Sequence, residues 1–71
     1  MKVDIKPVEG TNTWVIEFPD KVIFLITRTE HSDYRLAKLT LEDRVEELTI
    51  TDTFEQALIY IKEHTGFRYS W

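Results

Sequence analysis

Residues 14–26 read WVIEFPDKVIFLI, and the architecture of the chain can be built around this stretch. Trp14, Ile16 and Phe18 alternate with other residues in the period-2 pattern of a β-strand. Pro19-Asp20 then supplies the fixed φ angle and the short polar side chain of a tight turn, so a second strand returns along the first. This turn sets the register, in which the predicted pairs are Phe18 with Val22, Ile16 with Phe24 and Trp14 with Ile26. We predict that this face belongs to the core.

The other face of the same hairpin is also apolar. It carries Val15, Ile23 and Leu25 beside Thr13 and Glu17, because residues 22–26 are apolar without interruption. A continuous apolar run of this length is consistent with a strand that is buried on both sides. Both faces of the hairpin therefore require cover.

Three more strands are predicted around the hairpin. Residues 3–6 alternate apolar with charged side chains, and Pro7 ends this first strand. Residues 45–50 form a short last strand in which Leu48 and Ile50 alternate with Glu47 and Thr49. Between them, residues 34–41 form a strand. Which face of this strand belongs to the core is left undecided by the sequence, because one face holds Ala37, Leu39 and Leu41 and the other holds Tyr34, Leu36 and Lys38.

One helix is predicted at residues 53–65. Asp52 is the expected N-cap, with Glu55 three residues later to complete a capping box, and Gly66 stands where a C-terminal cap belongs. The helical spacing predicts an apolar stripe made of Phe54, Ala57, Leu58 and Ile61. The sequence therefore predicts a single α+β domain over residues 1–71, an antiparallel β-meander of four to five strands, strongly twisted or curled into a half-barrel, with one C-terminal helix packed on one face.

A single helix covers only one face of such a sheet. The second face could be covered by strong twist of the sheet, by the aromatic tail at residues 67–71, or by a second subunit. A chain of 71 residues buries only about 60% of the surface of its unfolded form, and this one has no cysteine to reinforce the fold. We therefore expect a homodimer, or association with another protein, through an interface predicted at Val15, Ile23, Leu25, Ile59, Tyr69 and Trp71.

The net charge of the chain and its N-terminal residues argue against two classes of function, nucleic-acid binding and membrane insertion. The chain carries a net charge of −4 and no basic block, which argues against nucleic acid as a partner because phosphate backbones are bound chiefly by Lys and Arg. Residues 1–7 mix charged with apolar side chains, and the sequence has no apolar run of the ~20 residues that a membrane span requires. The sequence thus predicts a cytoplasmic protein without a membrane segment.

Catalytic chemistry is not indicated by any residue pattern. His31 lies in the polar loop at 29–33, which has neither the spacing of a zinc site nor that of a calcium loop. His64 is expected in the last helical turn, where a donor side chain meets the free carbonyl groups. Gly10 and Gly66 are isolated, so no phosphate-binding loop exists. We predict no enzyme activity and no cofactor, and a small ligand-binding domain or enzyme built on His31 is the weakest of three hypotheses.

The remaining hypothesis is a single-stranded nucleic-acid binder. Tyr34 and Lys38 share a strand face, and Arg28 and Arg35 flank the loop before it, so a sheet could present an aromatic ring between basic groups. The order of a meander and a helix is similar in topology to that of dimeric single-strand binders of the Whirly type. The basic, glycine-rich sequence pattern of those proteins is absent, so this resemblance extends to topology alone.

Overall fold

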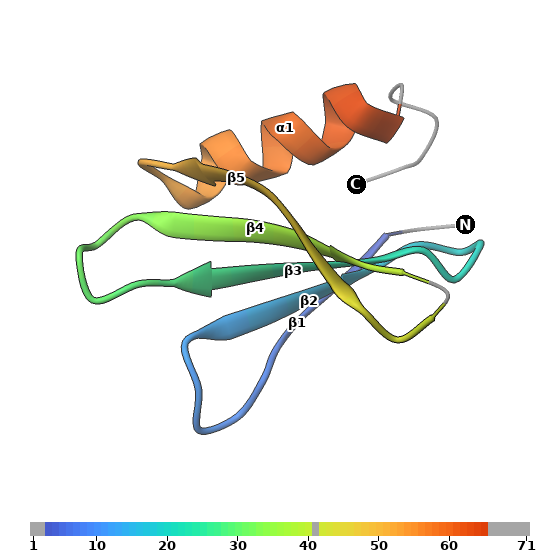
Figure 1. Ribbon diagram of the computed structural model, residues 1–71, viewed down its shortest axis with the longest axis horizontal. Coiled ribbons are helices and arrows are strands. Elements are labelled where there is room, and N and C mark those ends of the chain that lie inside the picture. Colours follow the sequence, from blue (N-terminus) through green and yellow to red (C-terminus); the bar gives the residue numbers. More distant parts are fainter. Residues whose placement is uncertain (1–2, 41, 66–71) are drawn as a thin grey trace.

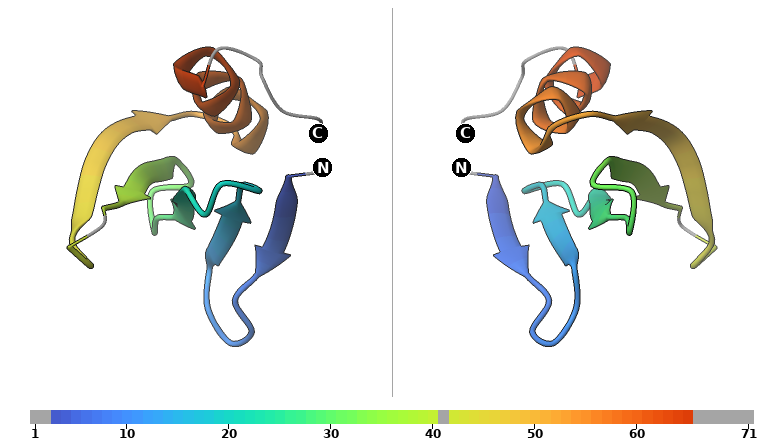
Figure 2. Two further views of the ribbon diagram at one scale, coloured as in Figure 1. Left: turned by 90° about the vertical axis from the view of Figure 1, so that its right-hand side faces the viewer. Right: turned by 90° about the vertical axis from the view of Figure 1, so that its left-hand side faces the viewer.

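Five antiparallel strands follow one another through one sheet in chain order, and a helix lies across one side of it (Figure 1). The structure is a computed structural model, and it describes residues 3–40 and 42–65. Its elements are β1 (Asp4–Pro7), β2 (Thr13–Glu17), β3 (Ile23–Arg28), β4 (Tyr34–Leu39), β5 (Val45–Thr51) and α1 (Phe54–Thr65). This arrangement confirms the predicted α+β meander, and the twisted sheet is not closed into a barrel (Figure 2).

The hairpin of β2 and β3 has the register that its turn predicts. Ile16 pairs with Phe24 and Trp14 pairs with Ile26, while the Phe18 N–H donates to the Val22 carbonyl at 2.9 Å. Lys21 takes a φ of 71° at the end of this turn. The turns that join β3 to β4 and β4 to β5 repeat the same geometry, with positive φ at Ser32 and Asp43. One turn type thus fixes three successive hairpins, which explains the regular meander.

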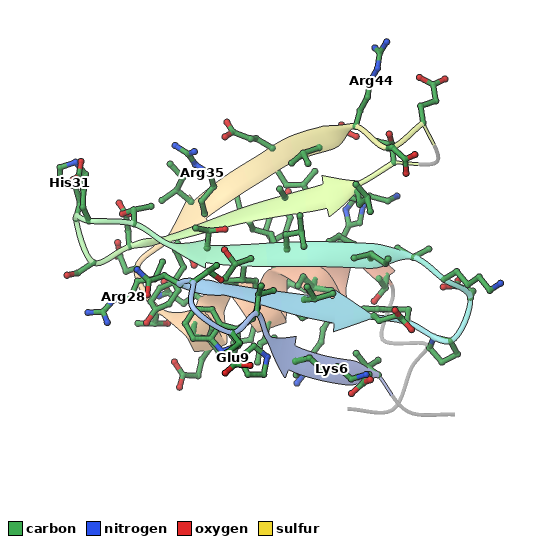
Figure 3. The ribbon with its side chains drawn as sticks, turned by 90° about the horizontal axis from the view of Figure 1, so that it is seen from below. Lys6, Glu9, Arg28, His31, Arg35 and Arg44 are labelled. Atoms are coloured by element: carbon green, nitrogen blue, oxygen red, sulfur yellow. The ribbon has the colours of Figure 1, made fainter. Side chains whose placement is uncertain are left out.

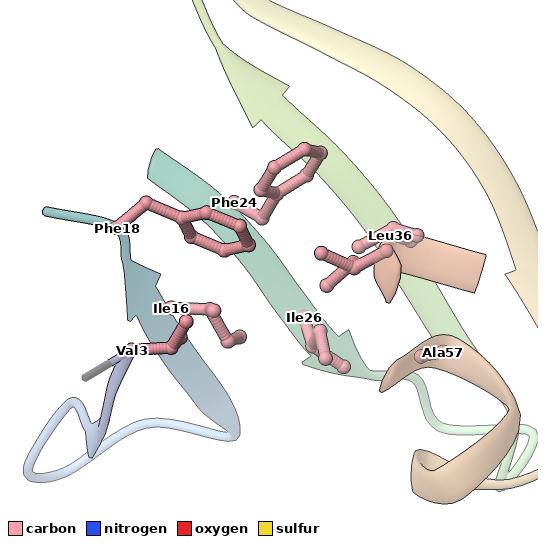
Figure 4. Packing of buried hydrophobic residues seen from close by; sticks show 8 residues of the cluster. Val3, Ile16, Phe18, Phe24, Ile26, Leu36 and Ala57 are labelled. Carbon is pink, nitrogen blue, oxygen red and sulfur yellow. The ribbon is translucent and has the colours of Figure 1, made fainter. Parts of the chain in front are cut away.

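The core lies between α1 and the side of the sheet that faces it (Figure 4). Phe24, Leu36 and Ile61 are fully buried there, and Phe18 is 2% exposed. Leu36 pairs with Ile26, so the face of β4 that carries Tyr34, Leu36 and Lys38 is the core face. The remaining buried hydrophobic members of the cluster are Val3, Ile16, Ile26 and Ala57.

The last strand departs from simple alternation. Leu36 pairs with Thr49 and Ala37 pairs with Glu47, so Leu48 is an extra residue that forms a β-bulge. The bulge lets Leu48 pack against the core while Ile50, which pairs with Arg35, turns to the other side and is 56% exposed. The expectation that Leu48 and Ile50 share one face is therefore wrong, because period-2 alternation does not continue through a bulge.

The helix begins one residue later than expected and uses a different cap. The Gln56 N–H donates to the Thr53 hydroxyl at 3.1 Å, and the Asp52 N–H donates to the Gln56 side chain at 3.0 Å. Thr53 is therefore the N-cap, and the predicted box of Asp52 and Glu55 is wrong. Asp52 with Glu55 and Thr53 with Gln56 both match the sequence signature of a capping box, and the hydrogen bonds show that the second pair is the one that forms. The predicted C-cap, Gly66, lies outside the described residues.

Candidate functional site

The side of the sheet that faces away from α1 is the candidate functional surface, and we name it the open face. Figure 3 views the sheet from this side, with α1 behind it. Side chains of directly paired residues share a face, so the register of the strands gives the membership of this surface. Its apolar residues are Val15, Ile23, Leu25, Ala37, Leu39, Val45 and Ile50.

These apolar residues form two rows across the sheet. Val15, Leu25 and Ala37 lie side by side in one row, and Ile23, Leu39 and Val45 lie in the next. Neighbouring side chains half-bury Val15, Ile23 and Leu25 and cover Ala37, which is 5% exposed, whereas Val45 at the edge is 58% exposed. No element within residues 3–40 and 42–65 packs over the open face. The predicted need for cover on the second face is thus visible as a contiguous apolar surface.

Charged side chains flank the apolar rows at both edges of the sheet. On β1 the Lys6 ammonium group lies 3.0 Å from the Asp4 carboxylate, and both side chains are largely exposed. The hydrogen bond that the Lys6 ammonium group donates to this carboxylate raises the pKa of Lys6, and the charges of Asp4 and Glu17 act in the same direction. At the opposite edge the Arg35 guanidinium lies 3.2 Å from the Glu47 carboxylate. The open face therefore has an apolar centre and a charged rim.

The predicted interface residues are only partly brought together. Val15, Ile23 and Leu25 are neighbours on β2 and β3, as their alternation predicts. Ile59 is 50% exposed on α1, which packs on the other side of the sheet (Figure 2). One flat contact surface cannot hold Ile59 and the open face together. Tyr69 and Trp71 lie outside the described residues.

The four predicted nucleic-acid contacts are divided between the two sides of the sheet. By the strand register, Arg28, Tyr34 and Lys38 are on the side of α1, whereas Arg35 is on the open face. The Tyr34 ring is occupied by packing, because its centroid lies 6.3 Å from that of Trp14 and 5.9 Å from that of Phe54. The structure therefore gathers no platform of Tyr34 with all three basic groups.

The two histidines lie in different settings. His31 is at the tip of the β3–β4 turn with its side chain 81% exposed, and it lines neither the cleft between the β2–β3 and β4–β5 turns nor the small cavity beside His64. The His64 ring stacks on Tyr60 at 6.3 Å and meets the edge of Phe24 at 6.0 Å. Within the described residues no three His, Asp or Glu side chains gather as a metal site would require.

The larger of these two cavities is a cleft at the end of the sheet. It has a volume of about 960 Å³ and runs between the β2–β3 and β4–β5 turns, lined by Val22, Ile23, Leu39 and Val45 together with charged residues of both turns. The basic residues Lys21 and Arg44 line it together with acids such as Asp20 and Glu42, so its charges select no single class of ligand. Ile23, Leu39 and Val45 extend the open face into this cleft.

Sequence reasoning missed part of the open face. The alternation places Ala37 and Leu39 on one side of their strand, but the sequence alone does not assign that side to the open face. Val45 and the rim residues Lys6, Arg35 and Glu47 follow only once the pairing of all five strands is known. The available signal was the unbroken apolar run at 22–26, which indicates that a second apolar surface exists but not how far it extends.

Comparison with known proteins does not identify the chain. No protein-family model matches it, and neither the curated proteins nor the solved structures contain a match. Within the described residues no helix has both the length and the apolar character needed to cross a membrane.

Proposed function

We propose that this chain is a non-enzymatic protein-interaction module that forms a homodimer through the open face of its sheet. The observation that carries the proposal is the apolar centre formed by Val15, Ile23, Leu25 and Leu39, flanked by charged pairs at both edges. Interfaces between proteins have the same arrangement, because charged residues are depleted at their centre and their rim is polar.

The free energy gained by burying apolar side chains supports association of two chains through the open face. Large apolar side chains gain roughly 1.5–3 kcal/mol each on full burial, and those of the open face are half-buried or exposed in one chain. A domain of this size has a margin of about 3–5 kcal/mol from a single core. Covering the open face would add to that margin at every concentration where the dimer is populated.

The charge distribution supports a second copy as the partner. The whole chain carries −4, but the strand residues of the open face are three acids, Asp4, Glu17 and Glu47, and two bases, Lys6 and Arg35. Two such nearly neutral faces repel one another weakly. The excess negative charge lies elsewhere, where it opposes less specific aggregation.

The test is the solution mass measured by light scattering over a dilution series. We expect a mass of twice the 8.5 kDa of one chain at high concentration, falling toward 8.5 kDa on dilution. A mass of 8.5 kDa at every concentration would contradict self-association and direct the search to a different protein as the occupant of the open face.

A further inference from the structure

We propose that the outer edge of β5 is a second interaction surface, to which a basic, extended peptide adds as a further strand of the sheet. This inference goes beyond the proposed self-association and does not depend on it. It is carried by Val45 and Ile50, the two most exposed large hydrophobic residues of the described part of the chain, whose backbone groups also point out of the sheet.

The alternation of hydrogen bonds across the sheet shows where the backbone of Ile50 points. In an antiparallel sheet the N–H and C=O groups of one residue bond to the strand on one side only. The Thr29 N–H donates to the Asp33 carbonyl at 2.9 Å, so alternate pairs from there, which include Thr27 with Arg35, bond β3 to β4. Arg35 thus turns its groups to β3, and Ile50, its partner on β5, turns its own groups outward.

The same alternation holds at the other end of β5. The Thr40 N–H donates to the Arg44 carbonyl at 2.8 Å, so the next pair, Leu39 with Val45, makes no backbone bonds between β4 and β5. Val45 therefore also turns its N–H and C=O groups outward, and so does Glu47 two residues later. The bulge does not prevent pairing, because β4 itself pairs with β5 on both sides of it.

The two edges of the sheet differ in how well they accept another strand. β1 has four residues, ends in Pro7, which has no N–H, and carries Asp4 and Lys6, and all of these features oppose strand addition. β5 has seven residues, and its last four, 48–51, are uncharged. Among the described elements β5 contacts only β4 and α1, so its outer edge is uncovered within residues 3–40 and 42–65 (Figure 2).

The proposed dimer leaves this edge accessible. The sheet curves toward α1, so the open face is convex and β5 lies at its rim (Figure 2). Two convex faces in contact meet at their centres and separate toward their edges. Val45 and Ile50 therefore stay exposed whether the chain is a monomer or a dimer.

Charge selects a basic peptide as the occupant. Residues 42–55, which contain β5 and the turns beside it, hold six acids and one base, a net charge of −5. The two bases of β4, Arg35 and Lys38, reduce this to −3. The ion pair with Arg35 uses Oε1 of Glu47, and a carboxylate accepts hydrogen bonds on both oxygens, so a base on the added strand can share it.

The β5 strand of a second copy is a poorer occupant. Antiparallel pairing centred on Glu47 places the two Glu47 carboxylates opposite one another, and like charges directly opposite destabilise a sheet. A register that pairs Glu47 with Ile50 places each carboxylate against an apolar side chain. Pairing centred on Ile50 avoids both contacts but joins only the last residues of each strand.

The register defines the probe, a labelled peptide of sequence Thr-Val-Thr-Lys-Lys-Val-Thr. Laid antiparallel to β5 and matching its bulge, it places valines opposite Ile50 and Val45 and lysines opposite Glu47 and Glu46. Fluorescence anisotropy at low salt is expected to give a dissociation constant below about 1 mM. The same peptide with glutamates in place of its lysines should bind at least tenfold more weakly.

Backbone methylation tests whether the peptide binds as a strand. Methyl groups on the nitrogens of its second, fourth and sixth residues remove the N–H groups that face β5, and are expected to abolish binding. Methyl groups on the third and fifth nitrogens point away from β5 and should leave binding within threefold. Equal binding of both methylated peptides, or no binding of the parent peptide up to about 1 mM, would overturn the proposal.

The matched change in the protein is Ile50→Pro. The Ile50 N–H makes no bond to β4, so proline is tolerated at this edge position and the circular dichroism spectrum should not change. Peptide binding should weaken at least tenfold, whereas Ile59→Ala on α1 should bind as the original chain does. A light-scattering mass above that of two chains, lowered by Ile50→Pro, would show that a second copy occupies the edge and would overturn the choice of a peptide.

Discussion

Replacing Ile61 with alanine is expected to lower the free energy of unfolding by about 2–5 kcal/mol, which is enough to unfold much of the protein. Ile61 is fully buried in the core between α1 and the sheet. Removing its side chain loses the burial of three carbon atoms and leaves a cavity that the neighbouring side chains fill only in part. Urea unfolding followed by circular dichroism, at one fixed protein concentration, measures the effect.

The matched control is Ile59→Ala, two residues away on the same helix. Ile59 is 50% exposed, and alanine favours a helix slightly more than isoleucine does. We expect a change within about 0.5 kcal/mol at this position. Equal losses at Ile59 and Ile61 would mean that the helix does not present the face described to the sheet.

Replacing Leu25 with lysine is expected to abolish self-association without unfolding the chain. Leu25 is at the centre of the open face, through which the proposed dimer forms. The substitution removes two apolar side chains worth roughly 1.5 kcal/mol each and introduces two like charges at the centre of the contact. The dissociation constant should rise at least about 100-fold, and light scattering should then give the mass of one chain.

The matched control for this variant is Ile59→Lys. It introduces the same charge at an apolar residue that is exposed on α1 rather than on the open face. We expect Ile59→Lys to remain a dimer. Loss of the dimer in Ile59→Lys with retention in Leu25→Lys would move the interface to the helix side. Circular dichroism of both variants verifies that they are folded.

The hairpin shows why part of the fold could be predicted from sequence. Pro19-Asp20 fixes where the chain reverses, so the pairs Ile16 with Phe24 and Trp14 with Ile26 follow from counting outward from the turn. The apolar stripe of the helix follows equally from its spacing, and Ala57 and Ile61 are buried as expected. Local chemistry determines both features, so local reasoning is sufficient for them.

The predictions from sequence are wrong where two local patterns compete. Asp52 and Thr53 are both followed three residues later by a cap partner, Glu55 or Gln56, and the hydrogen bonds select the second pair. The bulge at Leu48 arises from how β5 follows β4 around the twisted sheet, and no residue type in the strand indicates it. Pairing between strands, which the sequence does not encode locally, determines both faces of β5.

Part of the candidate site could likewise be predicted from the sequence, and part could not. The continuous apolar run at 22–26 predicts a second apolar surface and names Val15, Ile23 and Leu25. The helical spacing places Ile59 off the apolar stripe and so suggests an exposed contact residue, and only the layer order shows that it lies on the other side of the sheet. The separation of Arg35 from Lys38 could have been predicted, because residues three apart on a strand point to opposite faces.

Nuclear magnetic resonance of labelled Ile, Leu and Val methyl groups over a dilution series reports which face makes the contact. The proposed dimer predicts that the methyl signals of Val15, Ile23 and Leu25 shift or broaden with concentration, while that of Ile59 stays constant. Open-face methyl signals that do not change with concentration, or changes confined to Ile59, would contradict self-association through the open face.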